Sequence, residues 1–134
     1  MTDPDVRGTL DALVEGTLAP EEFSHRDHLV VAVQALSRHD FEEAHALVAD
    51  GIRALTVRAG VPEKFNATIT FAFMSAGAER MADYTDFDAE RFLAAHPELL
   101  ERDFLASRYS PERLASPLAR RLPLLPDRAP NLNR

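Results

Sequence analysis

The sequence predicts an all-α fold, a compact single-domain helical bundle with short C-terminal helices and an extended tail rich in proline and leucine. Three observations support it. Apolar residues recur at helical spacing along most of the chain. Proline or a short polar residue stands where several of these segments begin. Almost no segment alternates as a strand would. The 134 residues include no cysteine and suffice for one buried core without disulfides.

The first two helices are expected on either side of a connection closed by Pro20. The first should run over residues 4 to 18, where the apolar pattern consists of Val6, Leu10, Leu13, Val14 and Leu18. Ser24, followed three residues later by Asp27, has the form of a capping box and predicts the start of the second helix. That helix carries Leu29, Ala32 and Leu36.

The third and fourth helices are predicted from a start signal and from a long apolar run. Asp40 with Glu43 repeats the capping signal, and an apolar stripe from Phe41 to Ala59 ends at Gly60 and Pro62. The fourth helix is expected to begin after Pro62. Because it is apolar on nearly every side, we expect it to be the central and most buried helix.

The C-terminal third should contain short helices and no long one. Residues 86–93 predict a short amphipathic helix, and Pro97 should open another that extends through Leu105. Ser110-Pro111 and Ser116-Pro117 are two further helix starts. We therefore assign residues 1–121 to the helical bundle and residues 122–134 to a tail that lies extended, because its leucines favour burial and its prolines prevent a regular hydrogen-bond ladder.

Charge and hydropathy limit the partners. The formal net charge of −7 argues against nucleic acid, whose binding depends on clustered lysine and arginine. No window has the roughly 18 apolar residues of a membrane span, and the first residues do not form a secretory leader. We expect a soluble, cytoplasmic protein whose partner is a small molecule. A homodimer is an alternative assembly, because a second copy could also bury the apolar fourth helix.

His25 and His28 are the leading candidates for a functional site. Residues three apart share a helix face, so both imidazoles should point the same way, at a separation that suits a metal or one polar ligand. They share that face with Leu29, which places them toward the bundle interior. In the structural alternative, His25 caps the helix and His28 bonds a neighbouring carbonyl.

A metal at this pair would need further ligands. His45, on the edge of the third helix's apolar stripe, is the best candidate for the third, and a boundary position in water is its alternative. Without cysteine, a divalent iron, zinc, manganese or copper ion would be held by histidine and oxygen ligands. Asp27 could help, but we interpret it as a helix cap.

A second polar feature lies in the apolar fourth segment. Asn66 and Thr70 are four residues apart and share a helix face, so they should project polar atoms into the core together. Thr68 and Thr70 could instead bond back to the preceding helical turn. The Asn66 amide has more valences to satisfy, which makes it a candidate for orienting a ligand.

The run Phe23-Ser24-His25-Arg26-Asp27-His28-Leu29, together with Phe65-Asn66-Ala67-Thr68-Ile69-Thr70, resembles a family of small, uncharacterised bacterial helical proteins. That family's pattern has an aromatic residue two positions before the first histidine and a later Tyr-His-x-Thr-x-Thr segment. Asn66 stands where the later histidine would be. The resemblance implies one pocket shared by His25, His28, Asn66 and Thr70, and it speaks against a three-histidine metal site here.

Two functions follow as hypotheses. In the first, the protein is a small enzyme in which His25, His28, Asn66 and Thr70 act on a small-molecule substrate. The histidines would then either bind a metal or serve, metal-free, as general acid and base. In the second, it is a non-catalytic ligand-binding or protein-interaction module with structural histidines. An enzyme requires a cavity open to solvent beside the histidines, whereas an interaction module requires none.

Overall fold

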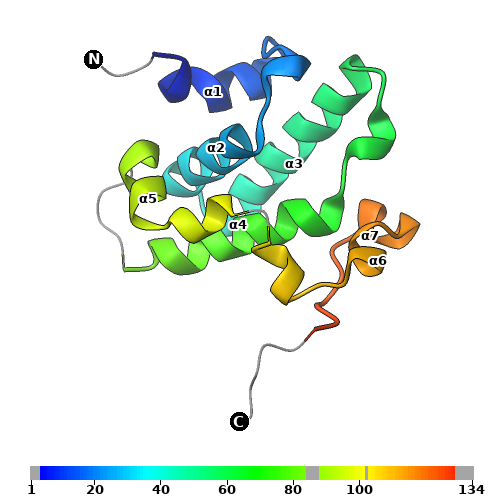
Figure 1. Ribbon diagram of the computed structural model, residues 1–134. Coiled ribbons are helices and arrows are strands. Elements are labelled where there is room, and N and C mark those ends of the chain that lie inside the picture. Colours follow the sequence, from blue (N-terminus) through cyan, green and yellow to red (C-terminus); the bar gives the residue numbers. More distant parts are fainter. Residues whose placement is uncertain (1–3, 84–87, 102, 129–134) are drawn as a thin grey trace.

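The computed structural model describes residues 4–83, 88–101 and 103–128, and within these ranges it contains helices and no strand (Figure 1). The predicted all-α fold is therefore confirmed. The α-helices are α1 (Pro4–Glu15), α2 (His25–Arg38), α3 (Phe41–Arg58), α4 (Ala67–Met81), α5 (Ala89–Ala95), α6 (Pro111–Leu114) and α7 (Pro117–Arg121). Short 3₁₀ helices are η1 (Pro20–Glu22), η2 (Pro62–Lys64), η3 (Pro97–Leu100) and η4 (Leu105–Ser107).

Helix α2 occupies the centre of the bundle. It packs against α1, α3, α4 and α5, and the seven consecutive residues from Leu29 to Ala35 are buried (Figure 1). One face of α2 completes a core with α1 and α3, and the other completes a core with α4, α5 and η3. The expectation that the fourth helix would be central is wrong, because α4 packs mainly against α2, α3 and α7, whereas α2 has helices on more sides. Helix α4 is nevertheless heavily buried, as expected, with eight buried residues against seven in α2.

Local capping confirms several predicted helix starts. The backbone N–H of Ser24 donates to the Asp27 carboxylate at 3.0 Å, and the N–H of Asp27 donates to the Ser24 hydroxyl at 3.2 Å, which completes a capping box. The Asp40 side chain caps α3 by accepting from the N–H of Glu43 at 2.9 Å. Ser110 and Ser116 cap α6 and α7, each of which begins with proline.

Other predicted boundaries differ from the structure. Helix α1 ends at Glu15, three residues early, because Gly16 adopts φ +80° and turns the chain. The segment after Pro62 forms only η2, and α4 starts at Ala67 with Asn66 as its cap. After Pro97 the chain forms η3 and η4 instead of one helix. The helix predicted over residues 86–93 is α5, capped by Asp88; residues 86 and 87 lie outside the described residues.

The first part of the tail lies along the helical body, as predicted. The expected reason, burial of its leucines, is wrong for Leu122 and Leu125, which are 41% and 79% exposed, and hydrogen bonds hold the tail instead. The buried hydroxyl of Thr68 donates to the carbonyl of Leu122 at 2.8 Å and accepts from the N–H of Leu124 at 3.0 Å. The Tyr109 hydroxyl donates to the Leu124 carbonyl at 2.9 Å. Residues 122–128 are thus tied to α4 and to the segment before α6, whereas residues 129–134 lie outside the described part of the chain.

None of the helices in the described ranges is long and apolar enough to span a membrane.

Candidate functional site

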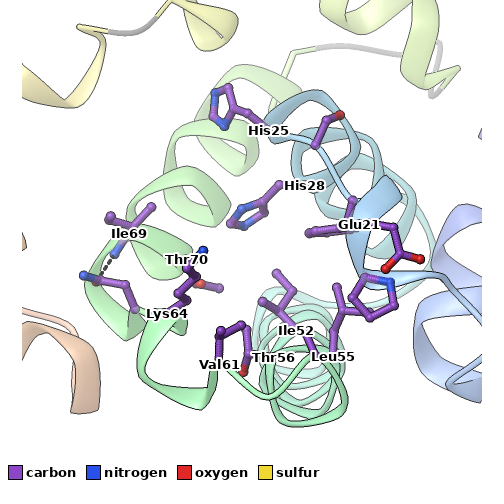
Figure 2. A pocket seen from close by; sticks show the side chains of 15 residues that line it. Glu21, His25, His28, Ile52, Leu55, Thr56, Val61, Lys64, Ile69 and Thr70 are labelled. Carbon is purple, nitrogen blue, oxygen red and sulfur yellow. Dashed lines mark hydrogen bonds between the residues drawn. The ribbon is translucent and has the colours of Figure 1, made fainter.

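A cavity of about 540 Å³ opens where the start of α2, the C-terminal half of α3 and the first turn of α4 meet. Figure 2 shows the side chains that surround it. His25, His28, Asn66 and Thr70 all line this cavity, although they lie on two helices about 40 residues apart in the sequence. Its volume falls in the range of small-molecule sites, roughly 300–1,000 Å³.

The walls of the cavity are mainly apolar. Phe23 precedes α2, Ile52 and Leu55 come from the inner face of α3, Val61 precedes η2, and Ile69 comes from α4. The charged lining residues Glu21 and Lys64 are exposed, one on η1 and one on η2, and so belong to its rim. An occupant would therefore contact hydrocarbon over most of its surface and polar groups at few points.

His28 presents the most unusual polar atom of the site. Its ring points into the space that the labelled residues of Figure 2 surround. The residue keeps some exposed surface, but its Nε2 is fully buried and has no hydrogen-bond partner. Burial, with a smaller contribution from the charge of His25, lowers the pKa of His28 from 6.5 to about 4. The imidazole is therefore neutral at pH 7.

His25 has a different environment from His28. Its side chain is exposed, and its ring lies edge-on to Phe73 with the centroids 4.8 Å apart. The Nε2 of His25 lies 3.1 Å from the carbonyl oxygen of Leu99. Because a carbonyl only accepts, Nε2 is the donor in this contact. The expectation that both histidines point into the interior is therefore wrong for His25, and it is His25, not His28, that bonds a carbonyl.

Asn66 and Thr70 share the cavity but differ in their hydrogen bonds. The Asn66 side-chain oxygen caps α4 by accepting from the N–H of Ile69 at 2.9 Å, and its Nδ2 donates to the carbonyl of Leu114 at 2.7 Å. The amide thus holds α4 and α6 together. Thr70 is 2% exposed, and no hydrogen bond of its hydroxyl is seen within the described part of the chain. Of the two, Thr70 has the side chain that remains available to a ligand.

The structural alternative for the threonines, a bond to the preceding turn, does not describe Thr68. Its hydroxyl bonds the tail at Leu122 and Leu124, more than 50 residues away in the sequence. Thr68 therefore fixes the tail and is not among the residues that line the cavity.

His45 lies outside the cavity. Its ring stacks on Phe41, with centroids 6.1 Å apart, and meets Phe71 edge-on at 5.4 Å. Burial is the main cause that lowers its pKa. The structure therefore does not bring His45 to His25 and His28. Across the ranges that the structure describes, no group of three or more histidine, aspartate and glutamate side chains is arranged to hold a metal ion.

The contribution of α3 to the site was missed from the sequence. Ile52, Leu55 and Thr56 line the cavity, yet in the sequence they are part of an ordinary apolar stripe with a polar residue at its edge. Glu21 and Lys64 were missed as well. Their position after a proline, in short turns on either side of the cavity, is the one signal that could have indicated them.

Comparison with protein-family models, with curated proteins and with solved structures gives no match to this chain. We therefore interpret the site from its own chemistry.

Proposed function

We propose that this protein binds a small, mainly apolar molecule in the cavity between α2, α3 and α4, and that the neutral imidazole of His28 recognises a polar group of that molecule. The observation that carries the proposal is the buried Nε2 of His28, which has no partner at the wall of a cavity. Leaving a buried polar atom unpaired costs about 1–3 kcal/mol. A ligand that hydrogen-bonds this nitrogen would recover that free energy.

The other polar side chains of the cavity support this assignment by elimination. Ser24 is engaged in the α2 capping box, the Thr56 hydroxyl donates to the carbonyl of Arg53 at 2.8 Å, and Asn66 uses its oxygen and its nitrogen. Glu21 and Lys64 are exposed on the rim. His25 is exposed as well, and its Nε2 donates to the Leu99 carbonyl. His28 and Thr70 remain as the polar side chains inside the cavity. An imidazole and a hydroxyl can each donate or accept, so together they suit one uncharged polar group.

Acid/base catalysis by the two histidines is the second candidate. It is favoured by the electrostatic influence of His25 on His28, which means that the imidazoles are close enough for the charge of one to lower the pKa of the other. A pKa of about 4 nevertheless makes His28 a weak base at neutral pH, and general bases are most effective when their pKa is near the working pH. For this reason we place binding before catalysis.

A metal-bound form of the site would rest on few ligands. His25 already uses Nε2 on Leu99, and His28 would supply one further imidazole. Stable protein sites for zinc and similar ions generally use three or four ligands. The binding proposal relies on the side chains alone, and metal content is measured directly in its test.

The test titrates uniformly ¹⁵N-labelled, untagged protein with 1-hexanol and follows the amide signals by NMR. We expect saturable shifts confined to residues around the cavity. His28→Leu should weaken binding at least fivefold, whereas the control His45→Leu, which replaces a histidine outside the cavity, should bind as the wild type does. Absence of saturable shifts at the cavity, or equal affinity in His28→Leu, would refute the proposal.

Metal content is measured on the same preparation by plasma mass spectrometry. The metal-free form of the proposal predicts no stoichiometric iron, zinc, manganese or copper. Stoichiometric metal that disappears in the His25→Ala/His28→Ala double variant, with helical content unchanged, would show instead that the histidines are metal ligands.

A further inference from the structure

A second cavity, of about 520 Å³, adjoins the first. His25 and Ile69 line both of them. His25 is the first residue of α2, and Ile69 lies in the first turn of α4, so the boundary consists of two side chains from the ends of two helices. The main-chain carbonyl of Leu114, a residue of the second cavity, also bonds Asn66 of the first. The two cavities are therefore neighbours on a common wall.

The second cavity offers an occupant almost only hydrocarbon. Phe73, Leu105 and Tyr109 are buried around it, and Leu100 and Leu114 are partly buried. The polar side chains that line it are hydrogen-bonded within the protein or exposed to solvent. The Tyr109 hydroxyl donates to Leu124, His25 Nε2 donates to Leu99, and Glu101 is exposed. A polar group placed there would lose its hydration without compensation, so the cavity suits an aliphatic or other apolar group.

The side chains at the boundary can move. His25 is exposed and is held by one hydrogen bond to a carbonyl, and Ile69 is only partly buried. Exposed side chains such as that of His25 change rotamer in picoseconds to nanoseconds. Displacement of His25 and Ile69 would connect the polar end of the first cavity, at His28 and Thr70, with the apolar second cavity.

We propose that the two cavities form one elongated site for a straight aliphatic chain that ends in an uncharged hydroxyl group. The hydroxyl lies against His28 and Thr70, and the chain passes between His25 and Ile69 into the second cavity. This inference rests on the proposed function for the position of the polar end. An uncharged end is favoured because a charged group beside two neutral side chains would be desolvated without a counter-ion. The two charged residues of the rim, Glu21 and Lys64, are exposed and opposite in sign, so together they favour neither an anionic nor a cationic end group.

The experiment measures the affinity of untagged protein for 1-alkanols from butanol to octanol by NMR titration. Each added methylene should raise the affinity up to about fourfold, as long as it is buried against the apolar wall of the second cavity. Ala106 lines the second cavity but not the first, so the tryptophan of Ala106→Trp should fill the second cavity alone. This variant should lose the added affinity for hexanol and octanol, whereas butanol should bind as in the wild type. Leu114→Trp should act in the same way.

A matched control is Val57→Trp, which adds the same ring at a side chain that is 60% exposed and lines neither cavity. It should leave all affinities unchanged. A cooperative urea unfolding transition shows whether each variant is folded. Because Ala106→Trp and Leu114→Trp fill the same cavity, either variant suffices for the test if the other does not fold.

The outcomes separate the two proposals. If His28→Leu weakens all alcohols but both tryptophan variants bind octanol like the wild type, the elongated site is refuted and the first cavity stands alone. If His28→Leu has no effect on any alcohol, the proposed function itself fails. Octanoate that binds more tightly than 1-octanol would refute the uncharged end group.

Discussion

His25 and His28 lie three residues apart on α2, yet only His25 has a hydrogen-bond partner at Nε2. The His25 ring donates to the carbonyl of Leu99 at 3.1 Å, whereas the Nε2 of His28 is buried and unpaired. Helical periodicity predicts that both residues share one face of α2. His25 is nevertheless the first residue of the helix and its side chain is exposed, whereas the Nε2 of His28, almost one turn further along, is buried. The two histidines therefore have separate physical roles.

The buried state of His28 predicts a specific dependence of stability on pH. The pKa of His28 falls from 6.5 in the unfolded chain to about 4 in the folded protein, mainly through burial. Between these values the unfolded chain binds a proton that the folded protein does not, so stability is fully present above pH 6.5 and is lost as pH falls toward 4. The shift corresponds to about 3 kcal/mol in the free energy of unfolding.

The measurement is urea unfolding of the wild type and of His28→Leu between pH 4 and 8. The difference between the two free energies isolates His28, because His45, whose pKa is also lowered, is present in both proteins. At pH 7 we expect His28→Leu to be at least as stable as the wild type, since it removes an unpaired polar atom. Parallel pH profiles for the two proteins would mean that the folded His28 titrates as an ordinary histidine.

Asn66 should prove to be a structural residue. Asn66→Ala removes the cap of α4 and the bond to the Leu114 carbonyl, which should lower the free energy of unfolding by about 1–3 kcal/mol. Asn66→Ser keeps a capping oxygen and should lose about half as much. Urea unfolding measures both losses. If Asn66→Ala is as stable as the wild type but no longer binds 1-hexanol, the Asn66 amide contacts the ligand and is not a structural residue.

Thr68 should control the attachment of the tail. Thr68→Val conserves shape but leaves the N–H of Leu124 without its acceptor, at a cost of about 1–3 kcal/mol, and Thr68→Ser should restore the bonds. Amide hydrogen exchange at Leu124 provides the readout. We expect faster exchange in Thr68→Val than in the wild type or Thr68→Ser, and unchanged exchange would show that other contacts, such as that of Tyr109, hold the tail.

Features encoded by neighbouring residues could be predicted from the sequence. The caps at Ser24 and Asp40 and the proline starts of α6 and α7 depend on a few adjacent residues, and the structure confirms them. The predicted helix boundaries were less accurate where two possible start signals lay close together in the sequence. Asn66 caps α4 four residues after Pro62, and the turn η2 takes up the chain between them.

Features that depend on distant residues could not be predicted in the same way. His45 lies near an apolar stripe, but whether it faces the cavity or an aromatic neighbour depends on Phe71 of α4. The partners of Thr68 are in a tail more than 50 residues away. The grouping of His25, His28, Asn66 and Thr70 around one cavity was expected partly from a resemblance, and periodicity alone could not have specified the distance between their helices.

Gly51 should determine how closely α1 approaches α3. A Cβ added at Gly51 would lie 2.6 Å from Cγ and 2.9 Å from Cδ2 of Leu13, a side chain that is 1% exposed and has little room to move. Gly51→Ala should therefore destabilise the protein by about 1–3 kcal/mol through overpacking, despite the better helix propensity of alanine.

The control is Gly8→Ala in α1, where nothing lies within 4 Å of the added Cβ. There, alanine should stabilise the protein by about 0.5–1 kcal/mol. Opposite signs in urea unfolding would establish the close contact between α1 and α3, whereas stabilisation by both substitutions would show that Leu13 can move aside.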